Sequence, residues 1–211
     1  MIAQLKKIRA WGRAKIGKAR LKRLAGTQPC RIIIGTSGVD QRSWIPTDVE
    51  YLNMLKPEDW AAFFVPESID AILAEHVWEH LTASDAVTAA SNCFRYLKPG
   101  GYIRVAVPDG FHPDPSYIGW VKPGGSGLGS DDHKVLYDYH SFAQVFEKAG
   151  FETQLLEYFD ESGKFHANEW DVQKGMVWRS QKFDERNLNG KLVYTSIIMD
   201  AWKDKSSESA N

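Results

Sequence analysis

The sequence predicts a single α/β domain built on a mainly parallel β-sheet. Short runs of β-branched residues alternate along the chain with helical patterns, an order that is typical of layered α/β folds. Glycine-rich turns directly follow some of these runs, which is where the ligands of such folds bind. A length of 211 residues and a hydrophobic content of 43% are sufficient for one globular core.

The net charge of −1 conceals a division of charge along the chain. Residues 1–24 hold nine basic and no acidic side chains, whereas residues 25–211 hold 17 basic and 27 acidic ones. The basic stretch lacks proline and favours a helix, which is either a solvated arm or a peripheral contact for a membrane or another polyanion. The acidic remainder disfavours specific nucleic-acid binding.

Three features of the sequence bear on domain limits and location. No apolar run approaches the ~18 residues of a membrane span, and the N-terminus lacks the apolar segment of a secretory signal. The only cysteines are Cys30 and Cys93, so a disulfide framework is not expected and a reducing, cytoplasmic location is. We expect a basic arm over residues 1–29, an α/β domain over 30–203 and a disordered tail over 204–211.

The first half of the predicted domain is rich in strands. Strands are expected at residues 31–34, 44–48, 69–74 and 102–107, with a further short strand within 49–66. Only nine residues separate the first two strands, so the first connecting helix is one turn or absent. A helix begins after Thr82, which with Asp85 fits a capping box, and it ends at Lys98-Pro-Gly-Gly101.

Residues 108–130 are a segment in which ten of 23 residues are Gly or Pro. Such a segment builds no core and is expected to be a lid or a substrate loop. A helix is predicted at 139–149 with Gly150 as its C-cap, followed by strands at 153–158 and 192–199.

Two candidate ligand contacts follow the first two strands. In Gly35-Thr-Ser-Gly38 the glycines let the backbone approach a nucleotide-like ligand, although an ordinary turn has the same pattern. Asp48 can accept hydrogen bonds from both hydroxyls of a ribose, although it can also cap a helix or a turn. Because the carboxyl ends of neighbouring parallel strands meet at one edge, the two features lie near each other.

The densest polar cluster in the sequence is Glu75-His-Val-Trp-Glu-His80. His76, Glu79 and His80 match the H-x-x-E-H pattern of zinc proteases. A further ligand would come from one of three acidic residues, Glu147, Glu152 or Glu157. Against zinc, the cluster lies at the end of a strand rather than within a helix. A structural role for His80 is therefore favoured, and no metal is assigned.

Several motifs follow one another in an informative order. They are the glycine turn, the acid after the second strand, DAILAEHVWEHL (70–81), FRYLKPGGYIRVAVPD (94–109), DDHKVLYDYHSF (131–142) and KAGF (148–151). The series resembles the class I S-adenosylmethionine-dependent methyltransferases, closest to the small bacterial type-11-like group. The resemblance implies one Rossmann-like domain with a seven-stranded sheet whose last strand is antiparallel, and S-adenosylmethionine as cofactor. It covers residues 31–151 well and residues 152–202 loosely.

The resemblance also implies which residues contact the cofactor. They are Gly35, Thr36, Ser37, Gly38, Asp48, Glu75 and His76. The family's loop usually reads G-x-G-x-G, and here Ser37 and Val39 replace its second and third glycines. This departure motivates an alternative, a catalytically degenerate binding module with the same fold. Val39 also breaks the G-x-S-x-G pattern, which disfavours Ser37 as a hydrolase nucleophile.

The expected reaction is methyl transfer to an oxygen or nitrogen of a small polar or sugar-like acceptor. Such a nucleophile needs its proton removed by a histidine or a carboxylate within about 3 Å. His133 is the first candidate, followed by Asp109 and His112, because they lie at a strand end and in the predicted lid. The alternatives are the binding module and a zinc hydrolase that uses His76 and its neighbours.

Overall fold

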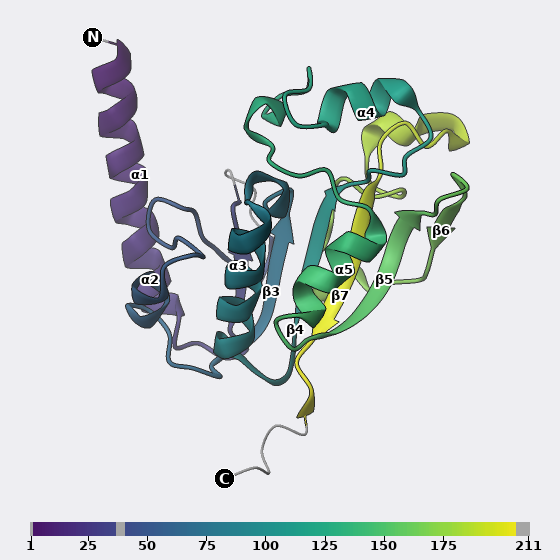
Figure 1. The fold of residues 1–211 in the computed structure, drawn as a ribbon. Coiled ribbons are helices and arrows are strands. Elements are labelled where there is room, and N and C mark those ends of the chain that lie inside the picture. Colours follow the sequence, from purple (N-terminus) through teal and green to yellow (C-terminus); the bar gives the residue numbers. More distant parts are fainter. Residues whose placement is uncertain (1, 37–40, 206–211) are drawn as a thin grey trace.

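A computed structural model describes residues 2–36 and 41–205, apart from the side chains of residues 2–11, 13, 188 and 189. A seven-stranded sheet with the order β2-β1-β3-β4-β7-β5-β6 forms its centre (Figure 1). The strands are β1 (Arg31–Ile34), β2 (Ile45–Pro46), β3 (Ile69–Glu75), β4 (Leu97–Pro108), β5 (Glu152–Phe159), β6 (Phe165–Ala167) and β7 (Ser196–Trp202). Neighbours among β1 to β4 are parallel, and β7 is antiparallel to both β4 and β5. The predicted α/β fold with an antiparallel last strand is confirmed.

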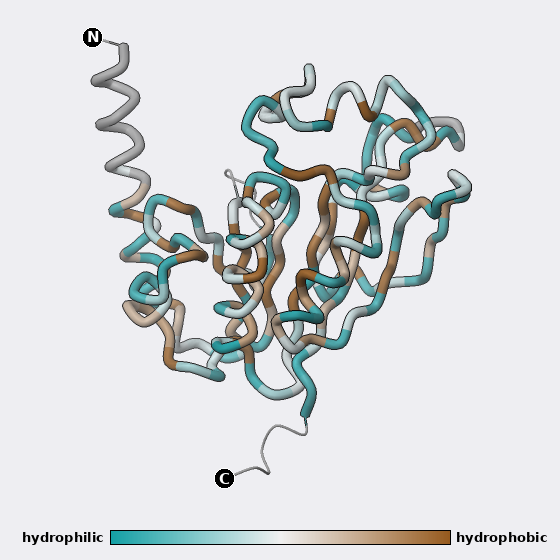
Figure 2. Tube along the Cα trace, in the orientation of Figure 1, coloured by the Kyte–Doolittle hydropathy of each residue, from teal (hydrophilic) through white to brown (hydrophobic). Residues whose placement is uncertain are grey.

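Two helices pack on one face of the sheet and close the larger core (Figure 1). The helices of the structure are α1 (Ile2–Leu24), α2 (Pro57–Ala61), α3 (Ala83–Tyr96), α4 (Pro115–Val121) and α5 (Tyr139–Glu147). Of these, α3 and α5 cover the sheet with apolar faces, and Figure 2 shows the hydrophobic residues concentrated along the strands beneath them. Thr82 caps α3 as predicted, because its side chain accepts a hydrogen bond from the backbone N–H of Asp85.

The second face of the sheet is covered by residues 168–184, which form loops and the single 3₁₀ turn η3 (Val172–Lys174). Val177 is fully buried there against apolar side chains of the sheet. Arg104 of β4 lies beneath this segment, where it donates hydrogen bonds to the carbonyls of Asp171 and Gly175. The segment thus covers the face from which the first connecting helix is missing: none of the described residues between β1 and β2 is helical.

Three predictions about the elements are wrong. Residues 49–66 form turns and α2 rather than a strand. Residues 108–130 contain α4, whose Tyr117 and Val121 are buried, so this segment does build a small core. The strand predicted at 192–199 begins only at Ser196 and continues to Trp202, and the short strand β6 was not predicted.

The basic N-terminal stretch is helical, as expected, but it is not wholly separate from the domain. Leu21, in the last turn of α1, is fully buried in the main core, whereas Ile16 is 72% exposed. The boundary at residue 29 and a membrane or polyanion contact through residues 1–24 stay predictions. Among the described residues, no helix is both long and apolar enough to cross a membrane.

Candidate active site

A cavity of about 690 Å³ lies at the carboxyl ends of β1 and β3, a volume typical of ligand pockets. Five of the predicted site residues line it: Gly35, Thr36, Glu75, His76 and His133. Its other polar and aromatic walls come from Gln41, Glu79, His80, Trp120, Ser126, Ser130, Arg179, Arg186 and Tyr194. The cavity therefore joins the glycine turn to the polar residues that follow β3.

The glycine turn is built so that no side chain projects into the contact between β1 and β3. Gly35 has φ +68°, a conformation that side chains disfavour, and a Cβ there would lie 2.7 Å from a methyl group of Val77. Both constraints explain why glycine ends this strand. The predicted contacts Ser37 and Gly38 lie outside the described residues.

Asp48, the predicted ribose ligand, follows β2 but does not line the cavity. It is half-buried, and its Oδ1 accepts a hydrogen bond from the backbone N–H of Val49 at 2.8 Å. Its role as a ribose acceptor stays a prediction.

Glu75 lies at the end of β3 and anchors a loop above the cavity. Its carboxylate accepts hydrogen bonds from the backbone N–H groups of Trp178 and Arg179, at 3.1 and 2.8 Å. A guanidinium nitrogen of Arg179 also lies 3.5 Å from it. Glu75 is thus a well-satisfied carboxylate that fixes residues 178–179 beside the site.

His76 is held in an unusual backbone conformation, with φ +54°. Such strain costs roughly 1–3 kcal/mol and is typical of functional sites. Its Nε2 lies 2.9 Å from the hydroxyl of Ser196, and its Nδ1 lies 3.2 Å from Oε1 of Glu79. Burial holds the pKa of His76 well below its usual range, so the ring is neutral.

Glu79 is the residue that the cofactor-based prediction missed. Its side chain is only 1% exposed, and neither carboxylate oxygen has a hydrogen-bond partner. Burial raises the pKa of this carboxyl to about 7. Buried carboxylates are normally satisfied, so an unsatisfied one at a cavity points to a function. The E-H pair at 79–80 was visible in the sequence, but only the zinc interpretation used it.

His133, the first predicted proton acceptor, faces Glu79 across the cavity. Its Nδ1 lies 2.6 Å from the carbonyl oxygen of Val121, and its Nε2 lies 3.9 Å from Oε1 of Glu79. The backbone carbonyl of Glu79 accepts the N–H groups of Lys134 and Val135, which fixes the segment that carries His133. The predicted placement of His133 in the site is therefore supported by the geometry.

Asp109 and His112 are correctly located after a strand but do not reach the cavity. Asp109 is fully buried, and its two oxygens accept the backbone N–H groups of Phe111 and Phe159. His112 stacks on Tyr117 with ring centroids 3.9 Å apart. Both side chains hold the fold together, so the catalytic roles predicted for them lose their geometric basis.

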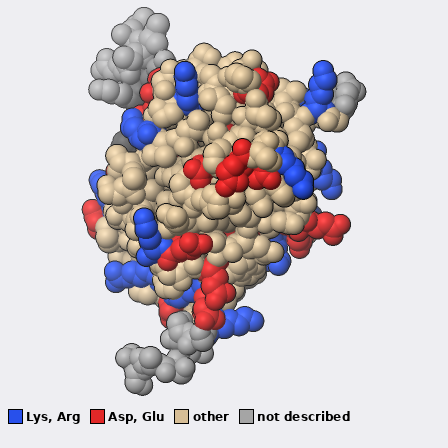
Figure 3. Space-filling view, turned by 45° about the vertical axis from the view of Figure 1, so that its right-hand side comes forward, with Lys and Arg blue, Asp and Glu red and all other residues tan. Residues whose placement is uncertain are grey.

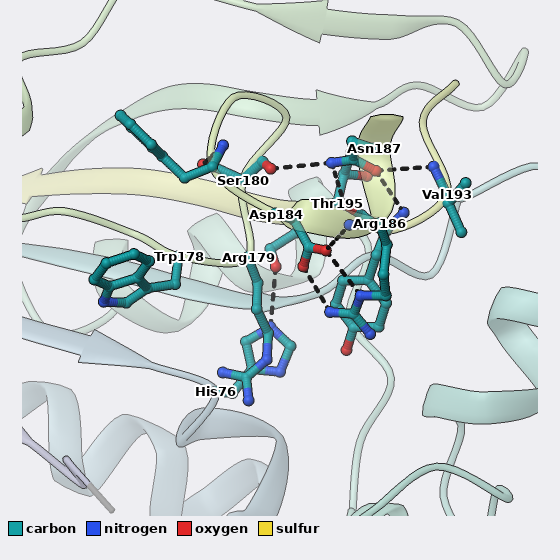
Figure 4. Close-up of polar contacts among 12 residues, drawn as sticks. His76, Trp178, Arg179, Ser180, Asp184, Arg186, Asn187, Val193 and Thr195 are labelled. Carbon is teal, nitrogen blue, oxygen red and sulfur yellow. Dashed lines mark hydrogen bonds and ion pairs between the residues drawn. The ribbon is translucent and has the colours of Figure 1, made fainter. Parts of the chain in front are cut away.

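The far wall of the cavity comes from residues 178–194, most of which lie between the strands predicted at 153–158 and 192–199. Figure 4 shows this segment lying above His76, with Arg186 paired to Asp184. The side-chain oxygen of Asn187 accepts a hydrogen bond from the backbone N–H of Val193, which stabilises this loop. The guanidinium of Arg186 lies 3.5 Å from the ring centroid of Tyr194, so both side chains are held in place.

The zinc ligands predicted from the H-x-x-E-H pattern, His76, Glu79 and His80, are not arranged as in a zinc protease. Residues 78–80 are the 3₁₀ turn η1 (Trp78–His80) rather than part of an α-helix, so the helical i, i+4 spacing of a zinc protease is absent. Of the acidic residues offered as a further ligand, Glu157 binds Trp170 and Gln181, and Glu147 binds Thr153.

Comparison with known proteins agrees with this geometry. A methyltransferase-domain family model matches residues 50–105, a segment that contains β3 and α3. A SAM-dependent methyltransferase of Thermotoga maritima, described as a possible histamine N-methyltransferase, is 13% identical and has a TM-score of 0.50; the match covers 95% of this chain and 96% of that one. A SAM-dependent methyltransferase of Archaeoglobus fulgidus is 17% identical and has a TM-score of 0.46. That match covers 90% of this chain and 94% of the other. No curated protein matches the chain.

The sheet order and the cavity at its carboxyl edge are those of a Rossmann-like fold, which the methyltransferase of Thermotoga maritima shares. The methyltransferase-domain model also matches the segment that contains the cavity residues from Glu75 to His80.

Proposed function

We propose that this chain is a class I S-adenosylmethionine-dependent methyltransferase that methylates an oxygen or a nitrogen of a small polar or sugar-like acceptor. The proposal rests on one observation: a single cavity runs from the glycine turn at Gly35 to the buried carboxylate of Glu79. The first end suits the cofactor and the second suits a polar acceptor. A catalytically degenerate binding module would have no need of an unsatisfied buried carboxylate at that second end.

The residues at the first end fit the cofactor. Gly35 places no side chain between the turn and the cavity, and Thr36 and Gln41 add polar groups to the same wall. When bound, S-adenosylmethionine supplies an electrophilic methyl group, so the protein has chiefly to position the acceptor.

The residues at the second end suit a polar acceptor. His133 presents a ring nitrogen to the cavity, and its other nitrogen is held by the carbonyl of Val121, so its position is fixed. Trp120, which is 41% exposed, offers an aromatic surface of the kind on which a sugar or an amine packs. His133 accordingly orients the acceptor atom or takes part in the removal of its proton.

Figure 3 shows acidic side chains gathered near the centre of one face of the molecule, with basic ones scattered around them. This distribution, like the acidic balance of residues 25–211, favours a small acceptor over a nucleic acid. A cytoplasmic location stays part of the proposal.

The test is transfer of a labelled methyl group from S-adenosylmethionine to pools of hydroxy compounds, amines and sugars. The proposal expects product with one of these pools and a loss of it in His133→Ala. His140→Gln is the matched control, because His140 is exposed and pairs with Glu161 outside the cavity. Labelling of proteins or nucleic acids alone would contradict the proposed acceptor class.

A further inference from the structure

Three side chains in the cavity direct metal-binding atoms toward one another. Glu79, His80 and His133 each offer one ligand atom, and all three atoms lie within 4.8 Å of one another. Two of these residues are adjacent in η1, whereas His133 comes from the segment after η2 (Ser130–Asp132). The cluster is therefore made by the fold and not by a local sequence motif.

The hydrogen bonds around the cluster fix which atoms face it. Nδ1 of His133 lies 2.6 Å from the carbonyl of Val121, which can only accept, so the ring hydrogen is on Nδ1 and Nε2 carries a lone pair. Nδ1 of His80 lies 3.4 Å from Oδ2 of Asp132 in the same manner. A carbonyl or carboxylate behind each imidazole is the usual support of a metal-binding histidine.

These orientations place a ring lone pair of His133 beside the carboxyl group of Glu79, which also lies 3.2 Å from Nδ1 of His76. Nε2 of His133 and Oε1 of Glu79 are 3.9 Å apart, and neither oxygen of Glu79 has a hydrogen-bond donor. Leaving a buried carboxylate unsatisfied is costly, because no interaction replaces its lost hydration. A bound cation would supply that interaction.

We propose that Glu79, His80 and His133 bind one divalent transition-metal ion of the zinc type. Ligand atoms about 2.1 Å from a tetrahedral metal ion lie roughly 3.4 Å apart, so side-chain rotations that shorten the widest separation by about 1 to 1.5 Å would complete the site. Two imidazoles and one carboxylate are a common set for zinc and iron(II), and this set leaves coordination positions open. All three residues line the cavity, so a ligand in the cavity could reach such an ion.

This site differs from the one that H-x-x-E-H suggests, because His133 takes the place of His76. His76 instead contacts Ser196 and is held by the strained end of β3. The pattern of a zinc protease is thus replaced by a site that is completed from residues more than fifty positions away.

The role of the ion rests on the proposed function. A divalent cation lowers the pKa of a hydroxyl group that faces it. The acceptor hydroxyl would lose its proton to water, and its oxygen would form a bond to the methyl carbon. The carbon–sulfur bond would break at the same time, leaving S-adenosylhomocysteine.

The test is titration of the metal-free, untagged protein with Co²⁺, followed by visible absorption, and with Zn²⁺ in competition with a coloured chelator. One ion per chain is expected. Glu79→Gln, His133→Gln and His80→Asn should each weaken binding tenfold or more, and His140→Gln should not. The side chain of His80 is 33% exposed, so His80→Asn should still fold.

Binding of S-adenosylhomocysteine by the same samples separates this inference from the proposed function. If the cofactor product binds but no ion does, or if the ion binds equally well to all three variants, the metal site is wrong. If the ion binds as expected but no acceptor is methylated, the metal site stands and the proposed function fails.

Discussion

Two regions of the molecule bury charged side chains, and they do so in opposite ways. On the second face of the sheet, Arg104 donates two hydrogen bonds to Asp200 and two more to backbone carbonyls. At the end of β3, Glu79 is equally buried and receives no hydrogen bond. The first region is electrostatically complete within the chain, whereas the second is completed only by something that enters the cavity.

The difference distinguishes a charged side chain that stabilises the fold from one that is available to a ligand in the cavity. Arg104 holds the 168–184 segment to the sheet, and its pair with Asp200 joins β4 to β7. Glu79 holds nothing with its carboxylate, although its backbone carbonyl positions the segment of His133. A variant should therefore affect stability in the first region and activity in the second.

The largest expected effect is on the rate of Glu79→Gln. Loss of the carboxylate should lower methyl transfer by about 10²–10⁴-fold, the usual contribution of a group on which removal of the acceptor's proton depends. The free energy of unfolding of this variant should not fall, because the amide replaces a buried carboxyl group that has no hydrogen-bond partner. Glu157→Gln is the matched control, since this buried carboxylate is satisfied outside the cavity; it should lose stability and keep its rate. Equal rates for the two variants would contradict the comparison.

Arg104→Ala should have the largest effect on stability. It leaves Asp200 buried without its partner, which typically costs about 3–5 kcal/mol. Urea denaturation would measure the change. If the free energy of unfolding of Arg104→Ala fell by less than about 1 kcal/mol, the pair of Arg104 and Asp200 would not stabilise the fold as the structure indicates.

A pair of substitutions in α1 tests where the basic arm joins the domain. Leu21→Ala should cost about 2–5 kcal/mol because the side chain is fully buried, whereas Ile16→Ala should cost almost nothing because Ile16 is exposed. Thermal and urea unfolding would both show the contrast. Deletion of residues 1–24 removes Leu21, so we expect it to weaken the fold. Unchanged stability in Leu21→Ala would show instead that the arm is separate.

Asp109 extends the comparison to a buried carboxylate that is satisfied by backbone groups alone. Burial raises its pKa to about 6 from an ordinary value of 3.8. The folded chain therefore binds this proton more tightly than the unfolded chain, so its contribution to stability is greatest below pH 4 and is lost as the pH rises through 6. The ¹³C chemical shift of the Asp109 carboxyl carbon should titrate with a midpoint near pH 6. A midpoint near 4 would show that the site is solvated.

Much of the fold could be predicted because its signals are local. The run Arg31–Ile34, the cap at Thr82 and the turn at Lys98-Pro-Gly-Gly101 each specify an element through neighbouring residues. The helix α4 was missed because the many glycines and prolines of 108–130 conceal a short helix that begins at Pro115, under an Asp114 cap.

The site was less predictable because its contacts are distant in sequence. Glu75 and His76 were found from the resemblance, and His133 from its type and position. The importance of Glu79 depends on its burial and on the missing hydrogen bonds, which no local pattern encodes. The cavity wall from residues 178–194 likewise depends on backbone contacts to Glu75, which lies a hundred positions earlier.

The central claim is that one cavity holds the cofactor at the glycine turn and the acceptor at Glu79. A crystal structure of the protein with S-adenosylhomocysteine tests it most directly. We predict that the ligand lies against Gly35 and Thr36 with its sulfur directed toward His76 and Glu79. A ligand bound elsewhere, or no binding at millimolar concentration, would contradict the claim.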